Sequence, residues 1–315
     1  MPVAEALPFR PHPIWTSVPE SLSALKTNAC LTPLNHRLED IAYLGTQLAD
    51  ATIITRNSGA VIIGRGGYGP VQCEGMPTRL CRHRVALRFA KSAVVQAVRT
   101  IGDDSDPIAL VVADGVGKIS HIIQLTGSYD RHIAMALDAG AEVWLPTDFQ
   151  DIPLDVAPLS AIRALRANWS ESAPQDHLDP FLNGRDIERR RALPYIGSDR
   201  AWPIIPNSLW PFLDQLTDDG TSFGRIVPAT GLLQSDVGPL EMAKSHRGCW
   251  DSSSATAQFA LDMNAVGSVW VTVVDWFAQL ELYDAAGRGI AVLVADPLRS
   301  AEDWFYRLAA LPRAN

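Results

Sequence analysis

Two stretches of similar pattern decide the fold of this chain: Asp50-Ala-Thr-Ile-Ile-Thr-Arg-Asn-Ser-Gly-Ala-Val-Ile-Ile63 and Thr221-Ser-Phe-Gly-Arg-Ile-Val-Pro-Ala-Thr-Gly-Leu-Leu-Gln234. Each has a β-rich run, a turn that contains a glycine (Gly59 or Gly231) and a second β-rich run. The two glycines lie 172 positions apart (231 − 59). The pattern therefore predicts one β-hairpin that occurs twice along the chain.

The similarity continues on both sides of the hairpins. Residues 94–100 align with 266–272 at the same offset, and 108–118 align with 278–288 at an offset of 170 (278 − 108). The amphipathic helices expected before each hairpin and at the end of each half also correspond, over 36–49 and 208–217, and over 129–137 and 302–311. A persistent offset over about 100 residues predicts one fold used twice, which is a duplicated domain and not a solenoid.

We therefore expect an α+β fold, a tandem duplication of a unit with a large antiparallel β-sheet flanked by helices. The expected units are an N-terminal repeat over 1–138, a connecting segment over 139–206 and a C-terminal repeat over 207–315. The connecting segment is expected to have helices at 157–168 and 186–193, with Asp186 as an N-cap. It has no counterpart before the first repeat, so we expect a functional site there.

The composition restricts the class of protein. The chain has 315 residues with 47% hydrophobic residues, which suits two globular domains. A net charge of −8 argues against nucleic acid as the main partner. No apolar run approaches 18 residues, so no transmembrane helix is expected, and the N-terminus lacks the pattern of a signal peptide. These features predict a cytoplasmic protein that is not embedded in a membrane.

The four cysteines are scattered, which predicts free thiols and not a disulfide framework. Cys73, Cys81 and His83 lie close together in sequence, but their spacing matches no familiar zinc pattern.

A glycine-rich stretch, Gly64-Arg-Gly-Gly-Tyr-Gly69, fits the G-x-G-x-x-G pattern and follows a predicted strand. A dinucleotide site needs a helix to begin there, so that the helix N-terminus meets the pyrophosphate. Residues 70–77 contain Pro70, Gly75 and Pro77 and cannot begin a helix. The second half has a Gly-Pro pair, Gly238-Pro239, at the corresponding place, which favours a structural turn over phosphate binding.

The duplicated pattern resembles the bacterial cytoplasmic hemin-transport and hemin-degrading factor family (the HemS type), whose members are two tandem copies of one α+β unit. The resemblance runs from about His36 onward, without a long identical run. The residues that carry it are Arg56-Asn57, Gly66, Leu87-Arg88-Phe89, Trp270-Val-Thr272, 280–293, Trp304 and Leu311-Pro312. A membership of this kind implies haem as ligand or substrate, and an inner-membrane haem importer as a partner.

The resemblance also implies roles for particular residues. The stretch from Asp176 to Leu193 is similar to the family's axial-ligand region, which places His177 as the iron ligand and Phe181 beside the haem. Arg190 falls on the distal arginine, and Arg88 is similar to an arginine that contacts a propionate. The chemistry is consistent, because imidazole is a standard axial ligand and guanidinium binds carboxylates in a bidentate manner. A distal arginine would stabilise charge on an iron-bound oxygen species.

Simpler interpretations stand beside each of these roles. A histidine in the polar context Gln-Asp-His-Leu-Asp is typically exposed. The three arginines at 189–191 are typical of a solvated helix face, and Arg88 fits an exposed charge on a strand. The sequence also departs from the family: Val273-Val-Asp-Trp276 stands where relatives have basic residues, and Val294 stands near a family aromatic position. These departures remove candidate propionate partners.

Three functions follow from these residues and patterns. The first is haem binding for intracellular transfer or storage. The second is degradation of haem, dependent on oxygen and a reductant, with Arg190 as the catalytic group. The third is a non-haem binding or scaffold protein that keeps the fold and has lost the haem site, since a fold does not fix a function.

Overall fold

The computed structural model describes residues 19–26, 30–35, 37–69, 71–73, 85–90, 95–101, 108–137, 162–163, 166–167, 169 and 177–314. Within the N-terminal part of these residues the strands are β1 (Cys30–Pro33), β2 (Ala51–Arg56), β3 (Ala60–Arg65), β4 (Val71–Cys73), β5 (Ala86–Phe89), β6 (Val95–Ile101), β7 (Ile108–Asp114) and β8 (Ile119–Leu125). The helices there are α2 (Leu22–Lys26), α3 (Leu38–Gly45) and α4 (Ser128–Met135).

In the C-terminal part the strands are β9 (Ala201–Ile204), β10 (Phe223–Ala229), β11 (Leu232–Gly238), β12 (Met242–His246), β13 (Cys249–Ser253), β14 (Ala257–Asp262), β15 (Ser268–Val274), β16 (Phe277–Tyr283) and β17 (Gly289–Ala295). The helices are α6 (Asp179–Leu182), α7 (Asp186–Ala192), α8 (Leu209–Asp218) and α9 (Ala301–Ala309). Short 3-10 helices follow α7 (Leu193–Tyr195) and precede α8 (Pro206–Ser208).

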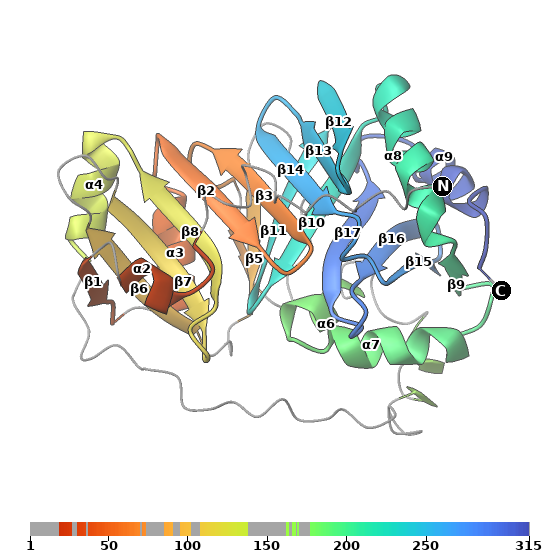
Figure 1. Cartoon of the computed structure of the whole chain (residues 1–315), viewed down its shortest axis with the longest axis horizontal. Helices are drawn as coiled ribbons and strands as arrows, with labels where there is room; N and C mark the ends of the chain where they lie inside the picture. Colours follow the sequence, from red (N-terminus) through yellow and green to blue (C-terminus); the bar gives the residue numbers. More distant parts are fainter. Residues whose placement is uncertain are drawn as a thin grey trace, which may run out of the picture.

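These strands form two large sheets, as Figure 1 shows. One has the order β1-β6-β7-β8-β2-β3-β14-β13-β12 and the other β4-β5-β11-β10-β17-β16-β15-β9. Neighbours pair antiparallel except β4 and β5, which are parallel. The observed architecture is therefore the α+β fold that the sequence predicts.

The strand registers repeat between the two halves. Ile54 pairs with Ile63, and Ile226 pairs with Ser235 at the corresponding place. Irregularities also correspond, because the β7–β8 register shifts at Val112/Ala113 and the β16–β17 register shifts at Leu282/Tyr283. A register shift inside a β-hairpin is a specific backbone feature, so its recurrence at the predicted offset confirms the internal duplication.

The two repeats exchange strands. β14 from the C-terminal half pairs with β3 of the N-terminal half, and β5 from the N-terminal half pairs with β11 of the C-terminal half. Each large sheet therefore contains strands of both repeats, an arrangement that the separate sheets expected from the sequence do not include. The boundaries of the connecting segment near residues 138 and 206 remain predictions.

Alternate residues of each strand pack on opposite faces of its sheet. On the eight-stranded sheet, α8 and α9 pack on one face through Leu213 and Trp304, and α6 lies on the opposite face through Phe181. On the nine-stranded sheet, α3 and α4 pack on one face, whereas Leu22 of α2 lies on the other. This layering places α6 and α7 beneath the eight-stranded sheet in Figure 1.

Some sequence predictions differ in detail or fall elsewhere. Asp186 is the first residue of α7 and Arg185 has the N-cap position, while the Asp186 carboxylate accepts the backbone N–H of Gly289 at 2.5 Å. The stretch Gly64–Gly69 ends β3 and makes a turn in which Gly66 has a φ of 88°, as a structural turn requires. Most of the helix expected at 157–168, together with Cys81 and His83, lies outside the described residues.

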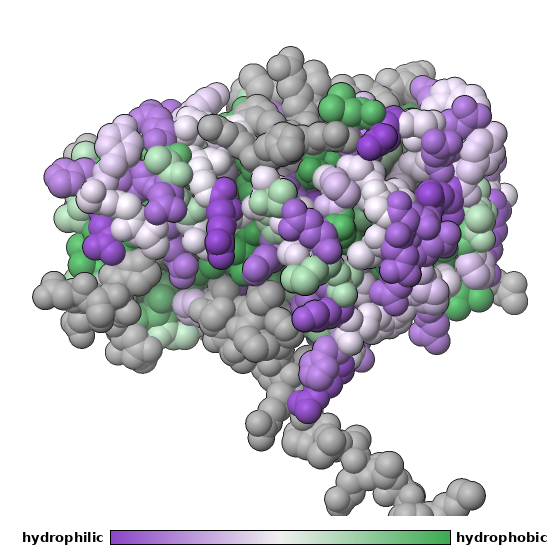
Figure 2. Space-filling model, turned by 90° about the horizontal axis from the view of Figure 1, so that it is seen from above, coloured by the Kyte–Doolittle hydropathy of each residue, from purple (hydrophilic) through white to green (hydrophobic). Residues whose placement is uncertain are grey.

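The described surface is mixed in character. Figure 2 shows hydrophilic residues gathered at the end of the molecule that carries α8 and α9. Among the helices that the structure describes, none has both the length and the apolar character to cross a bilayer.

Candidate functional site

Three of the predicted site residues lie together on one face of the eight-stranded sheet. His177 lies two residues before α6, Phe181 lies within α6, and Arg88 lies on β5 and reaches Asp179 of α6. His177, Phe181 and Arg88 are 4%, 3% and 3% exposed. The exposed positions that the sequence suggested for His177 and Arg88 are therefore wrong: His177 packs against Trp169 and Arg189, and Arg88 pairs with Asp179 of α6.

The two ring nitrogens of His177 both have partners. Nδ1 lies 3.4 Å from a guanidinium nitrogen of Arg189, and Nε2 lies 3.3 Å from the carbonyl oxygen of Trp169. Arginine has no acceptor, so Nδ1 accepts and Nε2 carries the proton that it donates to Trp169. The ring also packs against the Trp169 indole at a centroid distance of 4.6 Å.

Burial lowers the pKa of His177 from 6.5 to about 4, and the nearby positive charge of Arg189 contributes to this shift. The imidazole is therefore neutral at pH 7, which is the form that can bind a metal ion. In the present conformation, however, the proton on Nε2 and the contact of Nδ1 with Arg189 occupy both of its nitrogens.

Arg88 forms an ion pair with Asp179, with 2.5 Å between Nη2 and Oδ1. This pair joins β5, a strand of the N-terminal repeat, to α6 in the connecting segment. The guanidinium therefore already binds a carboxylate, which is the chemistry that the sequence predicted for it, but the carboxylate belongs to the protein.

Arg190 lies on α7, apart from this group. Its guanidinium carbon is 4.7 Å from the centroid of the Trp270 ring, and its Nε donates to the Ser268 hydroxyl at 2.8 Å. It is half-buried. The structure places it beside β15 and does not bring it to His177.

The most heavily bonded group on this face, the ion pair of Arg189 and Glu281, was not predicted from the sequence. Arg189 on α7 donates to both carboxylate oxygens of Glu281 on β16, at 2.6 and 3.0 Å. Glu281 is fully buried and also accepts hydrogen bonds from Thr272, Gln279 and Tyr283. The signal that could have found it was the polar alternation Gln279, Glu281, Tyr283 within an otherwise apolar strand.

This ion pair stays charged inside the protein. Burial by itself raises the pKa of Glu281, but Arg189 and the hydrogen-bond donors outweigh that effect and lower the pKa below its usual range. The same carboxylate raises the pKa of Arg189 against the opposing effect of burial. The carboxylate has several donors, as a buried charge requires.

Side chains fill the space between α6 and the sheet. Phe181 stacks on Tyr283 at a centroid distance of 5.7 Å, and the Arg189 guanidinium lies over the Trp169 ring at 5.0 Å. A void of about 10 Å³ lies beside Arg88 and Leu178. A volume of that size holds about one water molecule.

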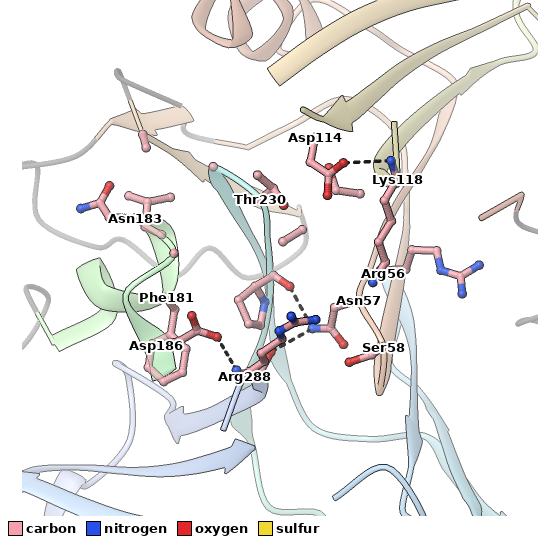
Figure 3. Close-up of a pocket in the computed structure, with 18 of the residues that line it drawn as sticks. Arg56, Asn57, Ser58, Asp114, Lys118, Phe181, Asn183, Asp186, Thr230 and Arg288 are labelled. Carbon is pink, nitrogen blue, oxygen red and sulfur yellow. Dashed lines mark hydrogen bonds between the residues drawn. The ribbon is translucent and has the colours of Figure 1, made fainter. Parts of the chain in front are cut away.

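A much larger cavity, of about 1150 Å³, lies where hairpin turns of both repeats meet the loop between α6 and α7. Figure 3 shows this turn cavity. Its charged lining residues are Arg56, Asp114, Lys118, Asp186 and Arg288, and its apolar ones include Phe181 and Ile119. Of the four predicted site residues, Phe181 alone lines it.

The side chain of Asn57 forms hydrogen bonds with both repeats at the base of this cavity. Its amide nitrogen donates to the carbonyl oxygens of Pro228 and Ile290 at 2.9 and 2.7 Å. Its amide oxygen accepts the backbone N–H groups of Gly59 and Ala60. The side chain therefore provides hydrogen-bond partners for backbone N–H groups in the turn of its own repeat and for backbone carbonyl groups at strand ends of the other repeat.

Among the described residues, no three His, Cys, Asp or Glu side chains are grouped so as to hold a metal ion. Cys30 is exposed, whereas Cys73 and Cys249 are buried, and all three are free thiols. The free thiols predicted from the sequence are therefore confirmed for these three residues.

Comparisons with known proteins support the fold. No protein-family model and no curated protein sequence matches this chain. Its structure is similar to that of ChuS, described as an E. coli haem oxygenase, with a TM-score of 0.71 and 16% identity over 89% of this chain and 88% of ChuS. It is also similar to holo-PhuS, a haem-binding protein from Pseudomonas aeruginosa, with a TM-score of 0.73 and 16% identity over 90% of this chain and 87% of PhuS. The resemblance in fold that the sequence indicated is thereby confirmed.

Proposed function

We propose that this protein binds haem and takes part in haem utilisation, by transferring or storing it. The shared fold with ChuS and PhuS supports this function. The observation that carries it is that Arg88 of β5, which lies 89 positions before His177 (177 − 88), reaches the same short segment that holds His177 and Phe181. The same proposal makes an inner-membrane haem importer the partner and the cytoplasm the location.

The residues as they lie do not fit haem. The space between α6 and the sheet is filled, both nitrogens of His177 have partners, and Arg88 is paired with Asp179. Haem binding at this place therefore requires α6 to move away from the sheet. The ion pair of Arg88 and Asp179 and the hydrogen bond from His177 to Trp169 are the contacts that such a movement breaks.

Titration of hemin into the purified protein, followed by visible absorption, tests the proposal. We expect a saturable Soret band that the substitution His177→Ala shifts or abolishes. His132→Ala is the matched control, because His132 is exposed on α4, and it should leave the spectrum unchanged. If hemin gives no saturable band with the folded protein, the proposal is wrong.

Degradation of haem is a finer proposal, in which Arg190 acts as the catalytic group. Addition of a reductant under air to the hemin complex separates it from storage, since degradation bleaches the Soret band and releases iron. Arg190→Gln should slow the bleaching without abolishing the band. An equal rate in both proteins would remove Arg190 from the proposal.

A second function has its own supporting observation. The filled face and the fully bonded Glu281 favour a non-haem binding or scaffold protein that keeps the fold. This alternative predicts that the protein stays folded and monodisperse with hemin present, while no His177-dependent band develops.

A further inference from the structure

The turn cavity is built from equivalent parts of the two repeats. The hairpin turn at 56–58 faces it together with its counterpart at 228–231, and the turn at 114–120 faces it together with its counterpart at 288–289. Equivalent turns of the two repeats therefore meet at this cavity. A cavity in such a place offers corresponding groups from two sides to one ligand.

The corresponding groups include a cation in each repeat. Lys118 ends the turn between β7 and β8, and Arg288 ends the turn between β16 and β17. Both side chains are exposed and both residues line the cavity. In Figure 3 both extend toward Asn57 at the base of the cavity.

The two turns present these cations in the same way. Asp114 accepts the backbone N–H groups of Val116 and Lys118 at 3.0 and 2.9 Å. Asp284 accepts those of Ala286 and Arg288 at 2.9 and 2.8 Å. Because backbone donors hold each aspartate, the turn fixes the backbone from which the cation extends.

The described lining lacks the side chains that usually bind haem iron. Among the described residues that face the cavity there is no His, Cys, Met or Tyr, the side chains that usually bind haem iron. Apolar groups such as Phe181, Ile119 and Pro228 lie beside the cations. The volume of about 1150 Å³ is slightly above the range of about 300–1,000 Å³ that is typical of ligand pockets.

We propose that the turn cavity binds a large organic dianion, with one acidic group at Lys118 and the other at Arg288, and with its apolar body against Phe181 and Ile119. This site goes beyond the proposed function, because it lies apart from His177 and uses charge and shape without a metal. Ammonium and guanidinium groups both form charge-assisted hydrogen bonds with carboxylates.

Metal-free protoporphyrin IX, a flat dicarboxylate, is the probe that tests this site. Its binding to the full chain is measured by equilibrium dialysis and by its own fluorescence. The variant Lys118→Gln/Arg288→Gln should raise the Kd about tenfold, as two partly exposed charge contacts allow. The matched control, Lys244→Gln/Arg299→Gln, removes the same charge from exposed positions outside the cavity lining and should leave the Kd unchanged.

The outcomes separate this site from the proposed haem function. Saturable binding that Lys118→Gln/Arg288→Gln weakens and His177→Ala does not supports the site, whatever hemin does. Absence of saturable binding, or equal loss in the control, overturns the site. If hemin then still gives a His177-dependent Soret band, the haem function stands without it.

Discussion

The same sheet face carries opposite chemistry in the two repeats. Val111 on β7 and Glu281 on β16 occupy equivalent places, paired with Val98 and Trp270 respectively. The face around Val111 is apolar and Leu22 packs on it, whereas the face around Glu281 holds a buried ion pair with Arg189. A duplicated backbone therefore accepts either chemistry, and the covering element decides which one is stable.

This difference between the repeats also bears on function. A buried ion pair adds little net stability, because desolvation of the two charges offsets their attraction. Stability therefore does not explain why the C-terminal face departs from the apolar pattern of the N-terminal one. The departure lies beside His177, which is the part of the molecule for which we propose a ligand.

The largest expected change in stability comes from replacing Glu281 with valine, the residue found at the equivalent position 111 of the N-terminal repeat. Glu281→Val leaves the Arg189 charge buried without its carboxylate and should lower the free energy of unfolding by about 3–5 kcal/mol. Urea unfolding followed by circular dichroism measures it. The double variant Glu281→Val/Arg189→Leu should recover most of the loss, and a double variant as unstable as the single one would contradict this explanation.

The next effect is a pH dependence to which the N-terminal repeat and the connecting segment each contribute one buried histidine. Burial lowers the pKa of His121 to about 3 and that of His177 to about 4, from 6.5 in the unfolded chain. The unfolded state therefore binds more protons below pH 6.5, so the stability that is present above that pH is lost as the pH falls toward 4. Between pH 6.5 and 4.5 each histidine should account for about 2 kcal/mol.

The variants His121→Gln and His177→Gln test this origin one histidine at a time. Each substitution should lower the slope of the free energy of unfolding against pH by the contribution of one bound proton over that interval. His132→Gln, at an exposed position, should leave the slope unchanged. A slope that survives the loss of both buried histidines would assign it to carboxylates instead.

A smaller effect is expected where the two repeats meet. Asn57→Ala removes the hydrogen bonds to Pro228 and Ile290 and should cost about 1–2 kcal/mol, because those buried groups lose a partner. Ala229 has the equivalent position in the other repeat, so Ala229→Asn is the control and should have the smaller effect. Thermal unfolding of the two variants measures the difference. Equal shifts of Tm would refute the idea that only the N-terminal repeat supplies this contact.

The smallest effect concerns the edge of the C-terminal face. Arg190→Met keeps much of the packing on Trp270 but removes the cation over its ring and the hydrogen bond to Ser268. We expect a loss of about 0.5–1 kcal/mol in urea unfolding. A loss several times larger would show that Arg190 belongs to the buried network of Arg189.

The position of the candidate residues could be predicted in part. The resemblance selected His177, Phe181 and Arg88, and the structure brings them together. It did not indicate that Asp179 pairs with Arg88, or that Arg189 and not Arg190 turns inward, since a one-residue shift on a helix turns a side chain by about 100°.

The sequence by itself determined the duplication, the hairpins and the alternating strands, because these depend on local periodicity and turn chemistry. Only the tertiary structure decided that β5 and β14 cross to the sheets of the other repeat, since strand pairing between distant segments leaves no local pattern. The turn cavity has the same origin: Lys118 and Arg288 are 170 residues apart (288 − 118), and the packing of the two repeats alone brings their turns to one place.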